Sequence, residues 1–218
     1  MSDLSFEIIG SRCELYAATP TLMLRLRITE AGGGKVHSVA LRTQVQIDPR
    51  RRNYSQDEVE RLPDLFGPPQ RWGETLRSLL WGHVPLMVPG FVGSTEIDLP
   101  LLCTYDFEVG AAKYLLSLDD GEIPLNVLFS GSVFSDEGGN LRIDQVPWER
   151  EAAFRLPVKI WREVMDRYFP GTAWMRVTRQ TLDALQRFKG RRALASWDEV
   201  IEALLVEAHE TKKEKEPA

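Results

Sequence analysis

Histidine and cysteine are the side chains that would point most directly to metal or nucleophilic chemistry, and the chain has few of them. The histidines are His37, His83 and His209, and the cysteines are Cys13 and Cys103. The sequence contains neither a Cys-x-x-Cys nor a His-x₃-His pair, whereas zinc and iron–sulfur sites need several converging ligands of these kinds. We therefore predict no metal, no cofactor and no catalytic residue.

Two runs rich in glycine and serine resemble catalytic or phosphate-binding motifs only superficially. Ser130–Ser132 lacks the Gly-x-Ser-x-Gly arrangement of a nucleophile elbow. Gly32–Lys35 lacks the spacing of a phosphate-binding loop, and no Ser or Thr follows its lysine. Because glycine adopts positive φ without strain, the second run is better interpreted as a turn.

Carboxylates gather in two short segments. Asp119, Asp120 and Glu122 form one cluster, and Asp136 with Glu137 forms the other. Loops at one end of a β-sandwich can together bind calcium through such oxygens. Ordinary hairpin turns are also rich in Asp and Gly. We favour the hairpin-turn interpretation and keep calcium binding as the alternative.

Basic residues form two clusters within an acidic protein. The chain has 27 Lys and Arg against 32 Asp and Glu, a net charge of −5. Neither cluster is interleaved with aromatic residues, as single-stranded nucleic-acid sites usually are. We predict a solvated loop and a basic helix end rather than a nucleic-acid partner. The clusters are Arg50–Arg52 and the group Arg187, Lys189, Arg191 and Arg192.

Tryptophan is the most informative residue type, with six copies. Two of them lie in an apolar segment that prolines interrupt, which suits a compact core poorly. Trp and Arg dominate the energetics of many protein interfaces. We predict a protein-interaction patch of Phe66, Arg71, Trp72 and Trp81. The alternative is that this segment packs over an open end of the fold.

The other tryptophans are expected to serve packing. Trp161 and Trp197 lie in patterns of helical period and are predicted to be core residues. Trp148 and Trp174 flank the first C-terminal helix, and we expect them to clamp it onto a sheet.

Residues 1–147 carry the period-2 alternation that is typical of strands. The alternating runs 22–28 and 39–47 flank the glycine-rich turn and predict an antiparallel hairpin. Further strands are expected near residues 84–88, 97–107, 112–118, 123–134 and 141–146. Many short strands separated by Gly and Asp turns predict an antiparallel β-sandwich of roughly seven to nine strands.

Two helical regions accompany the predicted sandwich, making the fold class α+β. A helical insertion is expected over 55–82, with a capping box at Ser55 and Glu58 and a second helix over 72–81. The segment 148–209 changes to helical period and predicts three helices packed on the sheet. We expect a single composite domain over 1–209, followed by a disordered tail over 210–218.

The beginning of the chain and its apolar runs bear on location. The first residues have neither a basic region nor an apolar one, so no secretory signal is predicted. No run approaches the roughly 18 apolar residues of a membrane helix. We predict a cytoplasmic protein without a membrane partner.

Three blocks of sequence resemble a known family. They are residues 124–134 (PLNVLFSGSVF), 145–151 (QVPWERE) and 161–174 (WREVMDRYFPGTAW). The chain resembles an uncharacterised bacterial family of this length, whose genes are loosely associated with nickel–iron hydrogenase clusters. The resemblance implies an accessory role near hydrogenase and names no catalytic residues.

Together these observations favour a non-enzymatic accessory or adaptor protein that binds another protein. One alternative is a small-ligand-binding sandwich, using the sandwich end or the cleft between sheet and helices. A further alternative is an enzyme whose residues are scattered over loops. Convergent carboxylates of perturbed pKa in a cleft would favour the enzyme.

Overall fold

A computed structural model of the chain describes residues 3–104, 110–137, 140–172 and 177–213. Two compact units are distinguished, Met1–Trp174 and Met175–Ala218, and each is considered by itself. Throughout the described ranges, every helix is too short or too polar to cross a membrane.

The first sheet contains three antiparallel strands in the order β1-β2-β5. These are β1 (Leu4–Cys13), β2 (Thr21–Glu30) and β5 (Ser94–Leu102). The predicted alternation holds in β2, because its apolar positions are fully buried while Arg25 is exposed. The buried apolar side chains of β2 are Leu22, Leu24, Leu26 and Ile28.

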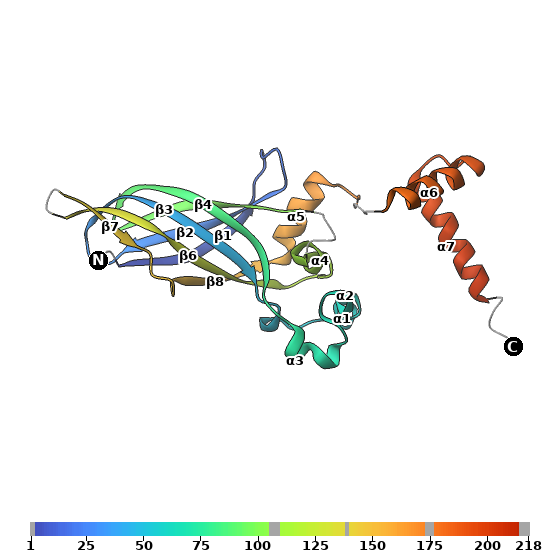
Figure 1. The fold of residues 1–218 in the computed structure, drawn as a ribbon, viewed down its shortest axis with the longest axis horizontal. Coiled ribbons are helices and arrows are strands. Elements are labelled where there is room, and N and C mark those ends of the chain that lie inside the picture. Colours follow the sequence, from blue (N-terminus) through green and yellow to red (C-terminus); the bar gives the residue numbers. More distant parts are fainter. Residues whose placement is uncertain (1–2, 105–109, 138–139, 173–176, 214–218) are drawn as a thin grey trace. The chain divides into compact units, whose positions relative to one another are not determined.

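The second sheet has five strands and is also antiparallel (Figure 1). Its order is β4 (Leu79–Val92), β3 (Lys35–Ile47), β6 (Glu122–Glu137) and β7 (Asn140–Gln145). β8 (Glu151–Pro157) pairs with the first half of β6, and β7 pairs with the second half. β7 therefore lies at an edge of this sheet.

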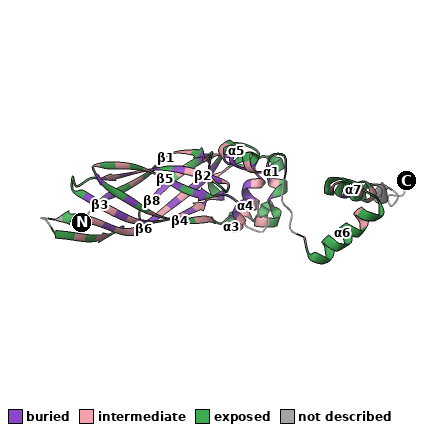
Figure 2. Cartoon of the chain, turned by 90° about the horizontal axis from the view of Figure 1, so that it is seen from above, coloured by how far each residue is buried: buried purple, intermediate pink, exposed green. Residues whose placement is uncertain are grey.

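The two sheets pack against each other through their apolar faces. Phe6 of β1 stacks on Phe129 of β6 with ring centroids 4.3 Å apart. Figure 2 shows buried positions alternating with exposed ones along the strands. One apolar cluster contains residues from both sheets, including Leu24, Val39 and Val127. The predicted α+β class with an antiparallel sandwich is confirmed.

The glycine-rich segment after β2 is a turn, but it does not close a hairpin. β2 pairs with β1 and β5, whereas β3 pairs with β4 and β6. The turn therefore carries the chain from one sheet to the other, and the predicted hairpin is wrong. The Glu30 carboxylate stabilises this crossing by accepting hydrogen bonds from the N–H groups of Gly32 and Gly34, at 3.0 and 2.9 Å.

Short helices follow β3. The capping box of Ser55 and Glu58 is present, as expected. The helix predicted over 72–81 is wrong, because the helix ends at Thr75 and β4 begins at Leu79, paired with Ile47 of β3. Sheet pairing has overridden the helical spacing. The helices are η1 (Pro49–Arg51), α1 (Gln56–Arg61), α2 (Pro63–Phe66), η2 (Pro69–Arg71) and α3 (Trp72–Thr75).

A fourth α-helix replaces a predicted strand. Residues 112–118 were expected to be extended, but α4 spans Gly110–Leu116. Its buried side chains recur at helical spacing and pack over the end of the sandwich: Ala111, Ala112, Tyr114 and Leu115. The end of the predicted strand over 97–107 lies partly outside the described residues.

The C-terminal helices divide between the two units. α5 (Val158–Tyr168) contacts β1, β2 and β8, and therefore packs on the sandwich as predicted. In the second unit, α6 (Arg179–Arg191) packs against α7 (Trp197–Lys213). The single domain over 1–209 stays a prediction. α7 continues into the predicted tail, and residues 214–218 lie outside the described part.

Candidate functional site

Phe66 and Trp72 of the predicted interaction patch pack into the fold. Phe66 is buried, and Trp72 is half-buried between it and Tyr54, with both rings edge-on to the indole. The indole N–H of Trp72 donates to the carbonyl of Gly67 at 2.9 Å. These two side chains belong to an aromatic cluster over the end of the sandwich.

The other two members of the predicted patch lie apart from that cluster. Trp81 is half-buried on β4, and its indole N–H donates to the carbonyl of Leu102 at 3.2 Å. Arg71 is exposed. The four residues therefore form no continuous exposed apolar surface, and their role in binding stays a prediction.

The basic run before α1 meets the acidic turn before β6. The buried guanidinium of Arg52 donates to Glu58 at 2.5 Å and to the carbonyls of Asp120 and Glu122 at 2.5 and 2.6 Å. These hydrogen bonds lie beside a hollow of about 510 Å³. The sequence had suggested the two clusters separately and did not indicate that they meet.

The carboxylates of this turn are engaged by protein groups. Burial alone raises the pKa of Glu58, but hydrogen bonds from the N–H groups of Asp119 and Ser55 and from Arg52 outweigh it, so the net pKa lies below its usual range. Asp119 forms ion pairs with Arg61 and Arg162. Over the residues that the structure describes, no group of three or more His, Cys, Asp or Glu could hold a metal ion.

The histidines and cysteines do not combine into a metal-holding group within the described ranges. His37 lies 3.8 Å from Asp136, and His83 points outward from β4. Cys13 and Cys103 are buried and free, and burial raises the pKa of Cys103 to about 12. A thiol with so high a pKa stays protonated, which is unfavourable for a nucleophile.

Two predictions about tryptophan are wrong. Trp148 does not clamp α5, because its side chain is almost fully exposed in the loop between β7 and β8. Trp197 is exposed at the start of α7 rather than buried. Trp161 is buried as expected, and Trp174 lies outside the described residues.

β7 presents its apolar side chains to solvent and turns its charged ones inward. Leu141 and Ile143 are 66% and 57% exposed, whereas the side chains of Arg142 and Asp144 are 32% and 13% exposed and form an ion pair of 3.0 Å. A half-buried strand normally shows the opposite polarity. This inversion marks the outer face of the five-stranded sheet as unusual.

The register continues this apolar surface across the sheet. Ile143 lies opposite Phe134, which lies opposite Ser38, which in turn lies opposite Pro89. In the next row Gln145, Ser132, Ala40 and Met87 are successive partners, and Met87 is 67% exposed. We call this surface the Met87 face. It consists of Ser38, Ala40, Arg42, Pro85, Met87, Pro89, Ser130, Ser132, Phe134, Leu141, Ile143 and Gln145.

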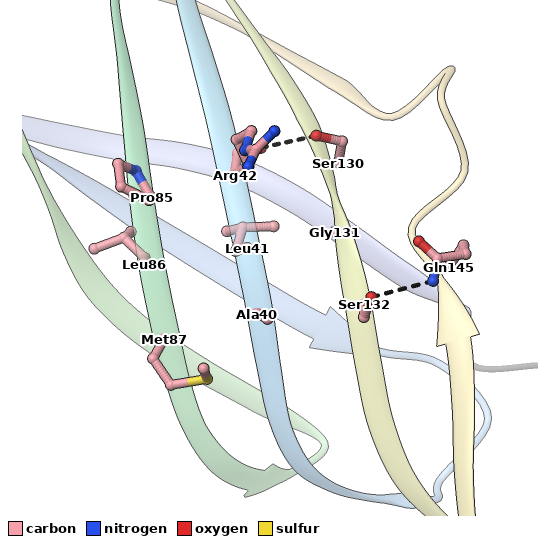
Figure 3. Close-up of a pocket in the computed structure, with 10 residues that line it drawn as sticks. All are labelled: Ala40, Leu41, Arg42, Pro85, Leu86, Met87, Ser130, Gly131, Ser132 and Gln145. Carbon is pink, nitrogen blue, oxygen red and sulfur yellow. Dashed lines mark hydrogen bonds between the residues drawn. The ribbon is translucent and has the colours of Figure 1, made fainter.

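A shallow hollow of about 640 Å³ lies on the Met87 face (Figure 3). Gly131 and Ala40 leave its centre without large side chains. The Gln145 amide donates to the Ser132 hydroxyl at 3.1 Å, and the Ser130 hydroxyl donates to the carbonyl of Arg42 at 3.4 Å. Arg42 is the one charged residue among those that line the hollow.

Glycine is required at the centre of this hollow. Gly131 has φ of +146°, and a Cβ atom there would lie 2.1 Å from the carbonyl oxygen of Ala40. Both the backbone conformation and the adjacent strand exclude a side chain. The close approach keeps β3 and β6 in register beneath the hollow.

The side-chain pattern of β4 indicates this face, although no chemical motif marks it. Pro85, Met87 and Pro89 alternate with buried Val84 and Val88, so the outward positions of β4 lack charged residues. On β7, apolar and charged residues alternate, but alternation alone does not reveal which set faces water.

Comparisons with solved structures give only distant likenesses. The chain is 12% identical to the CARDB domain of a Pyrococcus furiosus protein in complex with di-metal ions, covering 72% of this chain and 92% of that one, with a TM-score of 0.29. The chain is 15% identical to the putative ApaA protein from Bordetella pertussis, covering 71% of this chain and 93% of that one, with a TM-score of 0.28. It is 8% identical to a protein from Archaeoglobus fulgidus, covering 71% of this chain and 97% of that one, with a TM-score of 0.30. Such low values support no conclusion about function.

Sequence comparisons place the chain in a family. No curated protein matches it. The model of a family of unknown function, DUF6084, matches residues 1–213, nearly the whole chain. The chain therefore belongs to the DUF6084 family.

Proposed function

We propose that the chain is a non-enzymatic accessory protein of the cytoplasm that binds another protein through the Met87 face. The observation that carries this proposal is the inverted polarity of β7. Leu141 and Ile143 face water while the Arg142–Asp144 ion pair is turned inward. Exposed apolar area costs about 25 cal/mol per Å², a cost that a bound partner would remove.

The chemistry of the Met87 face defines the partner. Pro85, Met87 and Ile143 offer apolar contact, and the hollow above Gly131 can accept a protruding side chain. Arg42 supplies the one positive charge at the hollow. The partner that fits is a protein surface with an apolar patch and a nearby carboxylate.

Photo-crosslinking from single positions tests this proposal in the native cells. A photoreactive amino acid is placed at position 87 or 143, and at position 27 on the outer face of the first sheet as the matched control. We expect the same discrete protein adduct from positions 87 and 143, none from position 27, and loss of the position-87 adduct when Ile143→Glu is added. Equal adducts from position 27, or none from position 87, would contradict the proposal.

The hollow also favours a second candidate, a small ligand. Hydroxyl, amide and guanidinium groups converge there from Ser130, Ser132, Gln145 and Arg42. A small carboxylate is the class that these groups would bind. Thermal unfolding with a panel of such compounds tests it. A rise in Tm that Arg42→Ala removes is expected, and unchanged melting with every compound would reject this candidate.

The hydrogenase-linked version rests on the three sequence blocks that resemble a family associated with nickel–iron hydrogenase genes. In this version the partner bound by the Met87 face is a hydrogenase subunit or a maturation factor. Mass spectrometry of the position-87 adduct tests it directly. A discrete adduct with an unrelated protein would remove the hydrogenase link and leave the general proposal standing.

A further inference from the structure

The helical pair of the second unit leaves most of its apolar side chains uncovered. α6 has no buried residue. Within residues 197–209 of α7, Val200 is the one buried residue. Leu205 and Val206 are each 55% exposed. Other apolar side chains of the pair are also exposed, namely Leu182, Trp197, Ile201 and Leu204.

The spacing of these residues forms a continuous stripe on α7. Trp197, Ile201, Leu204 and Leu205 recur three or four residues apart, which places them on one face of the helix. On α6, Leu182 is joined by the half-buried Leu185 and Phe188 at the same kind of spacing. Two helices alone cannot enclose two such stripes, whereas four helices can.

The two helices carry opposite charge. α6 has four basic residues and the single acidic residue Asp183, whereas residues 197–209 of α7 have four acidic residues and no Lys or Arg. Arg192, at the C-terminal cap of α6, already forms an ion pair with Glu207 of α7. The basic residues are Arg179, Arg187, Lys189 and Arg191, and the acidic ones are Asp198, Glu199, Glu202 and Glu207.

We propose that the second unit binds the same unit of a second copy of this chain, forming a four-helix bundle. A two-fold axis would place α6 of each copy against α7 of the other, because that arrangement pairs the basic helix with the acidic one at both contacts. Like helices facing each other would oppose equal charges. The proposal goes beyond the Met87 face and does not depend on it.

Sedimentation of the full chain over a range of concentrations tests the assembly. We expect a dimer of twice 24.8 kDa that dissociates on dilution. Leu205→Glu combined with Ile201→Glu should raise the dissociation constant at least about 30-fold. Tyr16→Glu, at an almost fully exposed side chain of the first unit, is the matched control and should leave the dimer unchanged. A wild-type chain that stays monomeric at every concentration would overturn the proposal.

Charge reversal distinguishes this arrangement from nonspecific association and from a variant that fails to fold. One variant carries Arg187→Glu and Arg191→Glu, and the other carries Asp198→Lys and Glu202→Lys. Each alone should dimerise more weakly than the wild type, because the first variant makes α6 acidic like α7 and the second removes the net negative charge of residues 197–209. An equimolar mixture should restore a heterodimer. A mixture that remains monomeric while both variants retain wild-type helical circular dichroism would contradict the proposal.

Discussion

The outer faces of the two sheets differ sharply. The first sheet is covered by arginines and carboxylates, with Arg12 and Arg25 contacting Asp98 at 2.9 and 3.4 Å and Arg27 contacting Glu96 at 3.0 Å. Arg27 also lies 3.5 Å from Glu7, so these ion pairs form a ladder of side chains across β1, β2 and β5. The Met87 face, in contrast, is made of apolar residues, serines, Gln145 and the single arginine Arg42 at its hollow.

The difference shows that solvent exposure alone does not determine the composition of a face. Both sheets bury an apolar side against the other, so the core makes the same demand on each. Exposed ion pairs contribute only about 0–1 kcal/mol each, so the ladder adds little stability. The charged side chains of the ladder keep the outer face of the first sheet hydrated. The Met87 face lacks such a ladder, although the His37–Asp136 and Arg155–Glu122 pairs lie elsewhere on the second sheet. An exposed apolar patch of this kind is typical of a surface that a partner contacts.

Introducing charge on the Met87 face should have the largest effect. Met87→Glu with Ile143→Glu should weaken binding of the crosslinked partner about 100-fold, because two apolar contacts are replaced by carboxylates that must be desolvated. Isothermal titration calorimetry with the purified partner measures this. Arg25→Gln with Arg27→Gln on the first sheet should leave the affinity unchanged, and equal losses from both pairs would abolish the contrast between the faces.

A methyl group at Gly131 should destabilise the second sheet. Gly131→Ala brings a Cβ to 2.1 Å from the Ala40 carbonyl oxygen and forces an unfavourable φ. We expect the free energy of unfolding in urea to fall by about 1–3 kcal/mol. Gly10→Ala on β1, which has open space around it, is the control and should change stability by less than about 0.5 kcal/mol. Similar losses for both would argue against the close approach.

Apolar residues that face water should be replaceable without loss of stability. Leu141→Thr with Ile143→Thr should change the free energy of unfolding by less than about 0.5 kcal/mol, because neither side chain is in the core. The chain should also become less prone to aggregate, as static light scattering would show. A loss above about 2 kcal/mol would mean that these side chains are buried in solution.

Lowering the pH should have the smallest effect of these changes, and it acts on the carboxylates of the first sheet. Hydrogen bonds from Arg12 and from the Tyr16 N–H hold the pKa of Glu14 below its usual range. A lowered folded pKa means that the stabilisation is present above the usual glutamate pKa and is lost as pH falls through the lower folded value. Carboxyl NMR titration should show this lowered pKa. Arg12→Gln should return it toward normal, and an unchanged value would exclude the ion pair.

The sequence predicted the classes of element better than their pairing. Alternation identified β2 and β3, and the capping box of Ser55 and Glu58 identified α1, because these signals are local. The turn at Gly32–Gly34 was also recognised. Which strands β2 and β3 would pair with depended on contacts with β5 and β6, distant in the chain, so the hairpin prediction failed.

The candidate site was missed for a related reason. The interaction patch was assigned to tryptophans by residue type, but Trp72 gained a hydrogen bond to Gly67 and packing from Tyr54 within the fold. The segment 141–146 was predicted as a strand, with no assignment of the face that Leu141 and Ile143 would occupy. The register with β6 places them beside Phe134 and Asp136 on the outer face, where they contact water.

By itself the sequence determined the α+β class, the change from strand to helix period after residue 147, and the scarcity of metal-ligating and nucleophilic residues. These follow from composition and from spacing over a few residues. The tertiary structure decided that Arg52 closes on Glu58, that the chain crosses between sheets after Glu30, and that β7 is inverted. Each depends on burial and pairing between distant segments, because a side-chain period defines two faces without stating which one the core will cover.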